Sequence, residues 1–157
     1  MAQCRGTPPL APVSQPPPTP LSQPVILGFD PGRQKCGLAV MGLDRILCYQ
    51  QVVAATDVIA EITALRQQFP ISMIVLGDQT ASSGWKDALS QLPDPPRIML
   101  VDERYTTLEA RDRYWQMYPP SKLAGLIPQS LRKISRPIDD IVAILLIERY
   151  LNRLTSE

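Results

Sequence analysis

The stretch that decides the fold is Val25-Ile-Leu-Gly-Phe-Asp-Pro-Gly-Arg-Gln-Lys-Cys-Gly-Leu-Ala-Val-Met41. Its first apolar run ends at Asp30, and a second begins at Cys36 after a turn at Pro31 and Gly32. Two short β-rich runs separated by such a turn predict a hairpin. The first strand carries a carboxylate at its carboxyl end, where open sheets bind ligands. Asp-Pro-Gly is also common turn chemistry, so Asp30 alone leaves both a turn and a functional site open.

The composition fits one globular domain. A chain of 157 residues with 45% hydrophobic and 20% charged residues can bury one core, but it is too short for two. The formal net charge of +1 predicts that any basic surface is local. Histidine is absent from the sequence, which excludes Ser-His-Asp catalysis, Cys-His catalysis and histidine-based zinc sites.

The cysteines and the apolar runs indicate where the protein works. Cys4, Cys36 and Cys48 are odd in number and lack CxxC spacing, which argues against a disulfide framework and a zinc ribbon. No apolar run approaches the roughly 18 residues of a membrane span. We therefore expect a cytoplasmic protein.

The first 24 residues differ from the rest of the chain. Residues 1–24 contain eight of the 17 prolines and a single charged residue, Arg5. This composition predicts a disordered proline-rich tail without the apolar core of a secretory signal. The folded domain is therefore expected over residues 25–157.

The remaining patterns alternate between strands and helices. After the hairpin, strands are predicted over 45–53, 72–77 and 97–101, and helices over 57–69, 85–92, 108–118 and 137–154. The expected N-caps are Thr56, Thr106 or Thr107, and Ser135 or Arg136. Three antiparallel strands followed by alternating units imply a sheet with a parallel part. This order is that of the ribonuclease H-like fold, an α/β fold with a five-stranded mixed sheet flanked by helices.

Carboxylates stand at the ends of three expected elements. Asp30 and the pair Asp102-Glu103 follow strands that end at the same edge of the sheet, and Asp139 lies in the first turn of the last helix. Such acids can converge on one or two divalent cations, which prefer oxygen ligands. Two such ions activate a water molecule and stabilise the leaving oxygen of a phosphodiester.

Each acid also has a structural interpretation. Asp102 or Glu103 could pair with Arg104 at the surface. Asp139 and Asp140 could simply stabilise the positive end of the last helix. Three acids at one predicted edge favour the site over these alternatives.

Three segments resemble the signature motifs of the YqgF/RuvX family. They are Gly28-Phe-Asp-Pro-Gly-Arg-Gln-Lys-Cys-Gly-Leu-Ala-Val40, Asp102-Glu-Arg-Tyr-Thr-Thr107 and Asp139-Asp-Ile-Val-Ala-Ile-Leu-Leu-Ile-Glu-Arg-Tyr-Leu151. The family comprises RuvC-like Holliday-junction resolvases that are also linked to 5′-end maturation of small-subunit (16S) ribosomal RNA. The resemblance, over residues 25–153, implies a nuclease that hydrolyses phosphodiester bonds in structured nucleic acid with Mg²⁺ or Mn²⁺.

The resemblance also implies roles for individual residues. Asp30, Glu103 and Asp139 would be the catalytic metal ligands, and Lys35 would lie near the substrate phosphate. Arg104 and the pair Thr106-Thr107 would orient the second acid, and Arg104 is also expected to bind nucleic acid.

The sequence departs from the family pattern at three points. Asp-Pro-Gly at Asp30 is closer to the RuvC form. Asp140 replaces a frequently basic residue, so Asp139 and Asp140 compete for the third ligand role. Asp78 follows the fourth strand, where it is either a further ligand or an acid that starts a loop.

The region before Asp139 is locally basic. Between residues 97 and 136, the sequence contains eight Lys and Arg residues but only four Asp and Glu residues. Arg132, Lys133 and Arg136 are the best candidates for phosphate contacts, unless they only form a solvated loop. Three aromatic side chains nearby either stack on unpaired bases or, as we favour, pack within the protein: Tyr114, Trp115 and Tyr118.

Two other functions compete with a nuclease. A catalytically inactive nucleic-acid-binding module would keep the fold without cutting. A sugar or acetate kinase shares an Asp-x-Gly hairpin but needs two such domains, and this chain can supply only one. The expected partner is branched DNA or precursor ribosomal RNA, bound by a monomer or a homodimer.

Overall fold

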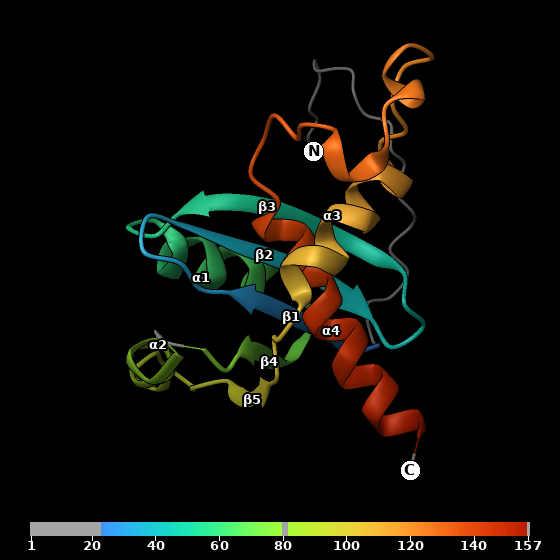
Figure 1. Cartoon of the computed structure of the whole chain (residues 1–157). Coiled ribbons are helices and arrows are strands. Elements are labelled where there is room, and N and C mark those ends of the chain that lie inside the picture. Colours follow the sequence, from blue (N-terminus) through green and yellow to red (C-terminus); the bar gives the residue numbers. More distant parts are fainter. Residues whose placement is uncertain (1–22, 80–81, 157) are drawn as a thin grey trace, which may run out of the picture.

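A five-stranded mixed sheet forms the centre of the molecule (Figure 1). The computed structural model describes residues 23–79 and 82–156, so nearly all of the predicted tail lies outside the described residues. The strands are β1 (Val25–Asp30), β2 (Lys35–Gly42), β3 (Leu47–Ala54), β4 (Ile71–Gly77) and β5 (Arg97–Val101), in the spatial order β3-β2-β1-β4-β5. β2 pairs antiparallel with both β1 and β3, whereas β1, β4 and β5 run parallel. The predicted five-stranded mixed sheet, antiparallel at its start and parallel in its continuation, is confirmed.

Helices cover both faces of the sheet. The helices are α1 (Val58–Gln68), α2 (Ser82–Ser90), α3 (Thr106–Met117) and α4 (Asp139–Thr155), and the short 3₁₀ turns η1 (Ala124–Leu126) and η2 (Gln129–Leu131) lie between α3 and α4. One apolar cluster joins α3 and α4 to one face, and a second joins α1 and α2 to the other. In the described part of the chain, each helix is too short or too polar to cross a bilayer.

The alternation of side chains along β1 decides where Asp30 points. Ile26 belongs to the cluster under α4, whereas Leu27 and Phe29 belong to the cluster under α1. Because successive side chains of a strand point to opposite faces, Asp30 lies on the α4 face with Ile26 and Gly28. The carboxylate of Asp30, at the end of β1, therefore lies beneath the start of α4.

Helix α4 packs directly on the backbone of β1. Ten of its 17 residues are buried, which fits the apolar run seen in the sequence. A side chain at Gly28 would overlap the carbonyl of Ala143 and come within 2.8 Å of Ile147 Cγ1. The absence of a side chain at this position therefore allows the helix to approach the sheet closely.

The predicted helix caps were wrong. The residues that precede α1, α3 and α4 are Asp57, Tyr105 and Ile138, and their side chains make no capping bond. The Thr106 hydroxyl donates 2.7 Å to the Glu103 carbonyl and thus fixes the preceding loop instead of capping the helix. Helix α4 begins at Asp139, and just before it the Arg136 guanidinium donates to the Pro137 carbonyl and to the Asp140 carboxylate.

Two cysteines are described, and both are free. Cys36 is buried in the core below α1, as expected of a small apolar residue, and Cys48 is exposed on β3. Cys4 lies outside the described residues.

Candidate active site

Two glycines flank Asp30 in the sheet. Gly37 of β2 pairs with Asp30, and Gly77 continues the register on β4. A side chain at Gly37 would overlap the backbone of Asp139, and one at Gly77 would come within 2.6 Å of the Glu103 carboxylate. Because these two glycines have no side chain, the start of α4 can lie against Gly37 and the Glu103 carboxylate against Gly77, on either side of Asp30. The structure thus brings together the three acids singled out from the sequence.

The electrostatics of Asp30 reflect this convergence. Burial raises the pKa of Asp30 to about 8, and the charges of Glu103 and Asp139 and hydrogen bonds with their carboxyl groups act in the same direction. Burial also raises the pKa of Glu103 and of Asp139. Ionising all three carboxyl groups therefore costs free energy, and a bound cation would lower that cost at this edge of the sheet.

Asp139 and Asp140 have different surroundings although they are consecutive. The Asp140 side chain is only 5% exposed and receives hydrogen bonds from Gln50 Nε2 at 2.8 Å and from the Arg136 guanidinium at 3.2 Å. Asp139 faces Asp30 instead, and its pKa, raised by burial and by the charge of Asp140, is partly lowered again by the positive charge of Lys35. Asp140 is therefore held by an ion pair with Arg136 and a hydrogen bond from Gln50, and sequence reasoning missed the second contact because Gln50 lies on a distant strand.

The choice between Asp102 and Glu103 is likewise decided by their partners. The Asp102 carboxylate pairs with the Arg104 guanidinium at 2.9 Å, and this contact lowers the pKa of Asp102. Glu103 points the other way, where its Oε2 accepts the backbone N–H of Gln79 at 3.0 Å. The surface-pair interpretation therefore holds for Asp102, and Glu103 is the acid that reaches the site.

Asp78 lies behind Glu103. Its Oδ1 accepts the backbone N–H of Glu103 at 3.4 Å, and its charge raises the pKa of Glu103 in addition to the larger effect of burial. Asp78 thus supports the loop that carries Glu103, which corresponds to the loop-starting alternative.

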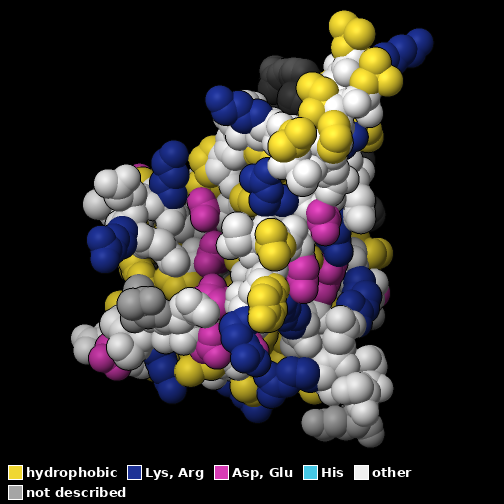
Figure 2. Space-filling view, viewed as in Figure 1, with side chains coloured by type: hydrophobic (Ala, Val, Ile, Leu, Met, Phe, Trp, Pro, Cys, Tyr) yellow, Lys and Arg dark blue, Asp and Glu magenta, His cyan; other side chains and the backbone are white. Residues whose placement is uncertain are grey.

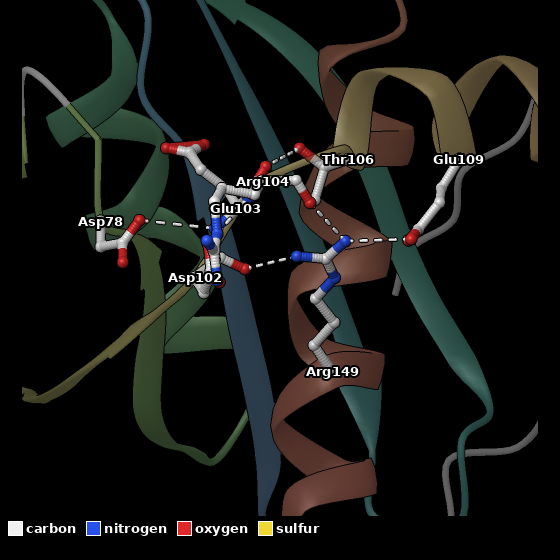
Figure 3. A network of polar contacts seen from close by, with 7 residues as sticks. All are labelled: Asp78, Asp102, Glu103, Arg104, Thr106, Glu109 and Arg149. Carbon is white, nitrogen blue, oxygen red and sulfur yellow. Dashed lines mark hydrogen bonds and ion pairs between the residues drawn. The ribbon is translucent and has the colours of Figure 1, made fainter.

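Arg149 of α4 connects the helix to the Glu103 loop (Figure 3). Its guanidinium donates to the carbonyls of Asp102 and Arg104 at 2.6 and 2.7 Å and to Glu109 Oε2 at 3.0 Å. The element that begins with Asp139 is therefore bonded to the backbone on both sides of Glu103. Sequence reasoning missed this contact, because helical periodicity does not reveal which loop a polar side chain will meet.

The predicted phosphate-binding residues fall into two groups. Lys35, Arg104 and Lys133 are exposed, and none of them lies over an aromatic ring of the described residues. Arg132 lies 5.4 Å from the Trp115 ring centre, and Arg136 lies 5.8 Å from that of Tyr114 and 5.5 Å from that of Tyr118. The aromatic trio contacts these cations and its own members within the protein, in agreement with the packing interpretation.

The three acids suit a hard divalent cation by type. Mg²⁺ is usually held by one or two carboxylates together with water and substrate oxygens, so it does not need a complete protein cage. Among the described residues, no three His, Cys, Asp or Glu side chains are spaced as a ready metal-binding group. The carboxyl groups of Asp30, Glu103 and Asp139 contact one another in this structure, so they would have to separate for an ion to enter between them.

The comparisons place the fold among known proteins. No family model and no curated protein matches the sequence. The chain is similar to Thermus thermophilus RuvC in complex with a Holliday junction substrate, with a TM-score of 0.50 and 16% identity over 82% of this chain and 95% of that one. A second Thermus thermophilus RuvC structure aligns over 82% and 96% of the chains at 14% identity with a TM-score of 0.48. A proposed sugar kinase from Cytophaga hutchinsonii gives a TM-score of 0.41 at 10% identity over 55% and 38%.

The first of these similarities confirms the ribonuclease H-like fold expected from the element order. At such low identity it establishes the fold alone.

Proposed function

We propose that this protein is a metal-dependent endonuclease of the YqgF/RuvX type. The observation that carries the proposal is the meeting of Asp30, Glu103 and Asp139 at one edge of a ribonuclease H-like sheet. Three distant segments supply these acids, and the side chains that would block their approach are missing at Gly37 and Gly77. In the part of the chain that the structure describes, none of these mutually repelling carboxylates forms an ion pair with Arg or Lys, which favours a cation site over a structural one.

Each residue has a distinct part in this proposal. Asp30 would hold the metal together with Glu103 and Asp139, and Mg²⁺ or Mn²⁺ fits this set of carboxylate ligands. The chemistry that such a cation supplies when bound is water activation and charge neutralisation at the leaving oxygen. Lys35, whose charge reaches Asp139, is placed to bind the phosphate next to the scissile bond. Arg104, exposed beside the loop, is suited to a neighbouring phosphate.

Asp78 and Asp140 have supporting parts in the same proposal. Asp140 is occupied by Arg136 and Gln50, and Asp78 bonds the backbone of Glu103. We therefore assign the third ligand role to Asp139 and leave Asp78 and Asp140 outside the metal set.

A cleavage assay tests the proposal. The full chain would be incubated with Mg²⁺ or Mn²⁺ and either a labelled four-way DNA junction or a precursor of 16S ribosomal RNA. We expect one substrate to be cut by the wild type and neither by Asp30→Asn or Glu103→Gln. Asp87→Asn, which removes an exposed acid from α2, serves as the control and should cut normally.

A catalytically inactive binding module is the second candidate. The lack of a ready metal-binding group among the described residues favours it. In that case either substrate would be bound, neither would be cut, and Asp30→Asn would bind as well as the wild type. Binding without cleavage would therefore reject the nuclease.

We also propose that residues 25–157 form the nuclease domain and that residues 1–24 lie outside it. In support, β1 begins at Val25 and α4 ends at Thr155. A chain that starts at Val25 should unfold at the same temperature and cut at the same rate as the full chain. The two described cysteines are free, which supports the proposal that the protein works in a reducing cytoplasm.

A further inference from the structure

Residues 119–138, here called the arm, connect α3 to α4 and carry η1 and η2. The arm projects from the body of the molecule, and its outer part is rich in hydrophobic side chains (Figure 2). Leu123, Leu126 and Leu131 are 80%, 81% and 73% exposed. The arm contains no acid and four cations, Lys122, Arg132, Lys133 and Arg136.

Polar and charged side chains attach the arm to α3. Arg132 lies over the Trp115 ring and donates to the Ile127 carbonyl at 3.0 Å. Gln129 Nε2 donates to Asp112 Oδ1 of α3 at 2.7 Å. Two cations thus face inward, since Arg136 also contacts the protein, while the leucines face solvent. On an ordinary surface loop, charged side chains face solvent and apolar side chains pack inward. A binding partner that covers the leucines explains why they are exposed on the arm.

The arm ends at Ile138, directly before Asp139. A substrate that lies across the carboxylate edge therefore passes the base of the arm. Since the arm bears only positive charge, its electrostatic complement is a polyanion.

We propose that the arm binds unstacked bases of the nucleic acid, with its leucines against the base faces and Lys122 and Lys133 on the phosphates. This inference rests on the proposed function and narrows its substrate. Apolar side chains can contact base faces only where bases are unpaired or separated, because stacked duplex bases hide those faces. The preferred substrate is therefore nucleic acid with unpaired nucleotides near the scissile phosphate, not a continuous duplex.

The charge of the arm argues against a second copy of the chain as its partner. In a two-fold dimer the same patch meets itself, so the cations of one arm would face those of the other. An anionic membrane would match the charge, but it would leave the position of the arm beside the carboxylates unexplained.

Equilibrium binding without divalent metal tests the proposal. The probes are a labelled duplex and the same duplex with a short unpaired bulge that contains 2-aminopurine. We expect the wild type to prefer the bulged probe by about tenfold and to change the 2-aminopurine fluorescence. Leu126→Ser combined with Leu131→Ser should remove the preference and leave duplex binding intact. Ile46→Ser, which removes another exposed apolar side chain, at 61% exposure in the β2–β3 turn, is the control.

Charge variants complete the experiment. Lys122→Gln combined with Lys133→Gln should weaken both probes by the same factor and keep the preference, because phosphates are present in both. The proposal is overturned if the leucine variant keeps the wild-type preference. It is also overturned if that variant instead dissolves a dimer in sedimentation, or loses binding to vesicles of anionic lipid.

The result of the binding experiment on the arm can be distinguished from the result of the cleavage assay for the proposed function. A wild type that prefers the bulge but cuts no substrate supports the arm and rejects the nuclease. A wild type that cuts, with a leucine variant of unchanged preference, supports the nuclease and rejects the arm.

Discussion

The two sides of the carboxylate site are held in place by different forces. Asp30 and Asp139 belong to a platform in which α4 lies against the backbones of β1 and β2 at Gly28 and Gly37. Glu103 belongs to a loop between β5 and α3, and polar side chains from outside the loop fix its backbone. Close packing fixes one side, and hydrogen bonds fix the other.

The difference matters for how the site can respond to a ligand. Packed backbones hold one arrangement and transmit strain, because a protein interior has little free space. Hydrogen bonds at a surface loop are individually worth only about 0.5–1.5 kcal/mol, so the loop can adjust without unfolding the core. We therefore expect Glu103 to move on metal binding while Asp30 and Asp139 stay in place.

Replacing Gly37 should break the platform and give the largest effect. In Gly37→Ala the new methyl group overlaps the Asp139 carbonyl, so α4 must move off β2. We expect the free energy of unfolding to fall by about 3 kcal/mol or more, measured by urea titration. Gly84→Ala in α2 is the matched control, because no atom of the described residues lies within 4 Å of its new methyl group. That variant should be about 0.5–1 kcal/mol more stable. A Gly37→Ala protein as stable as the wild type would contradict the platform.

Asp30→Asn separates the stability of the platform from its function. The pKa of Asp30 is about 8 in the folded protein, against 3.8 for an unperturbed aspartate. The folded state thus binds this proton more tightly, so the free energy of unfolding falls as the pH rises from about 4 to about 8. The asparagine cannot ionise and escapes this loss. Without metal we expect Asp30→Asn to be about 1–3 kcal/mol more stable than the wild type at pH 8 and equally stable at pH 4.

Thermal unfolding at the two pH values in the presence of a chelator measures this effect. In a parallel titration without chelator, added Mg²⁺ or Mn²⁺ should raise the unfolding temperature of the wild type at pH 8 and leave that of Asp30→Asn unchanged. Equal stability of both proteins at every pH would show that Asp30 carries no electrostatic cost.

Arg149→Met tests the loop side of the comparison. Removing the guanidinium frees the carbonyls on both sides of Glu103, so we expect the affinity for Mn²⁺ to fall about 10- to 100-fold, as for other supports of metal ligands. Arg113→Met is the matched control, because Arg113 also joins α3 to α4 through Glu148 at 2.7 Å but does not contact the Glu103 loop. Calorimetric titration with Mn²⁺ gives both affinities. Equal losses of Mn²⁺ affinity in the two variants would show that Arg149 only joins α3 to α4 and does not specifically support Glu103.

The sequence predicted the platform better than the loop for physical reasons. Apolar runs and the Asp-Pro-Gly turn are local signals, and they indicated the order of the elements along the chain and the position of Asp30 at the end of the first strand. The places of Arg149 and Gln50 depend on which polar groups the fold brings near them, and no local pattern encodes that. Sequence reasoning could have noticed Gly37 and Gly77 as glycines opposite an acid, but their purpose needs the positions of Asp139 and Glu103.

The pair Asp139 and Asp140 gives the smallest and most selective test. Asp140→Asn leaves the Arg136 guanidinium without its charged partner, although Gln50 can still bond the new amide. We expect a loss of about 1–2 kcal/mol in the free energy of unfolding with Mn²⁺ affinity within about twofold of the wild type. Asp139→Asn should do the opposite, with near-normal stability and an Mn²⁺ affinity at least about tenfold lower. If Asp140→Asn loses the metal and Asp139→Asn keeps it, the ligand is Asp140, and α4 presents its second residue to the site instead of its first.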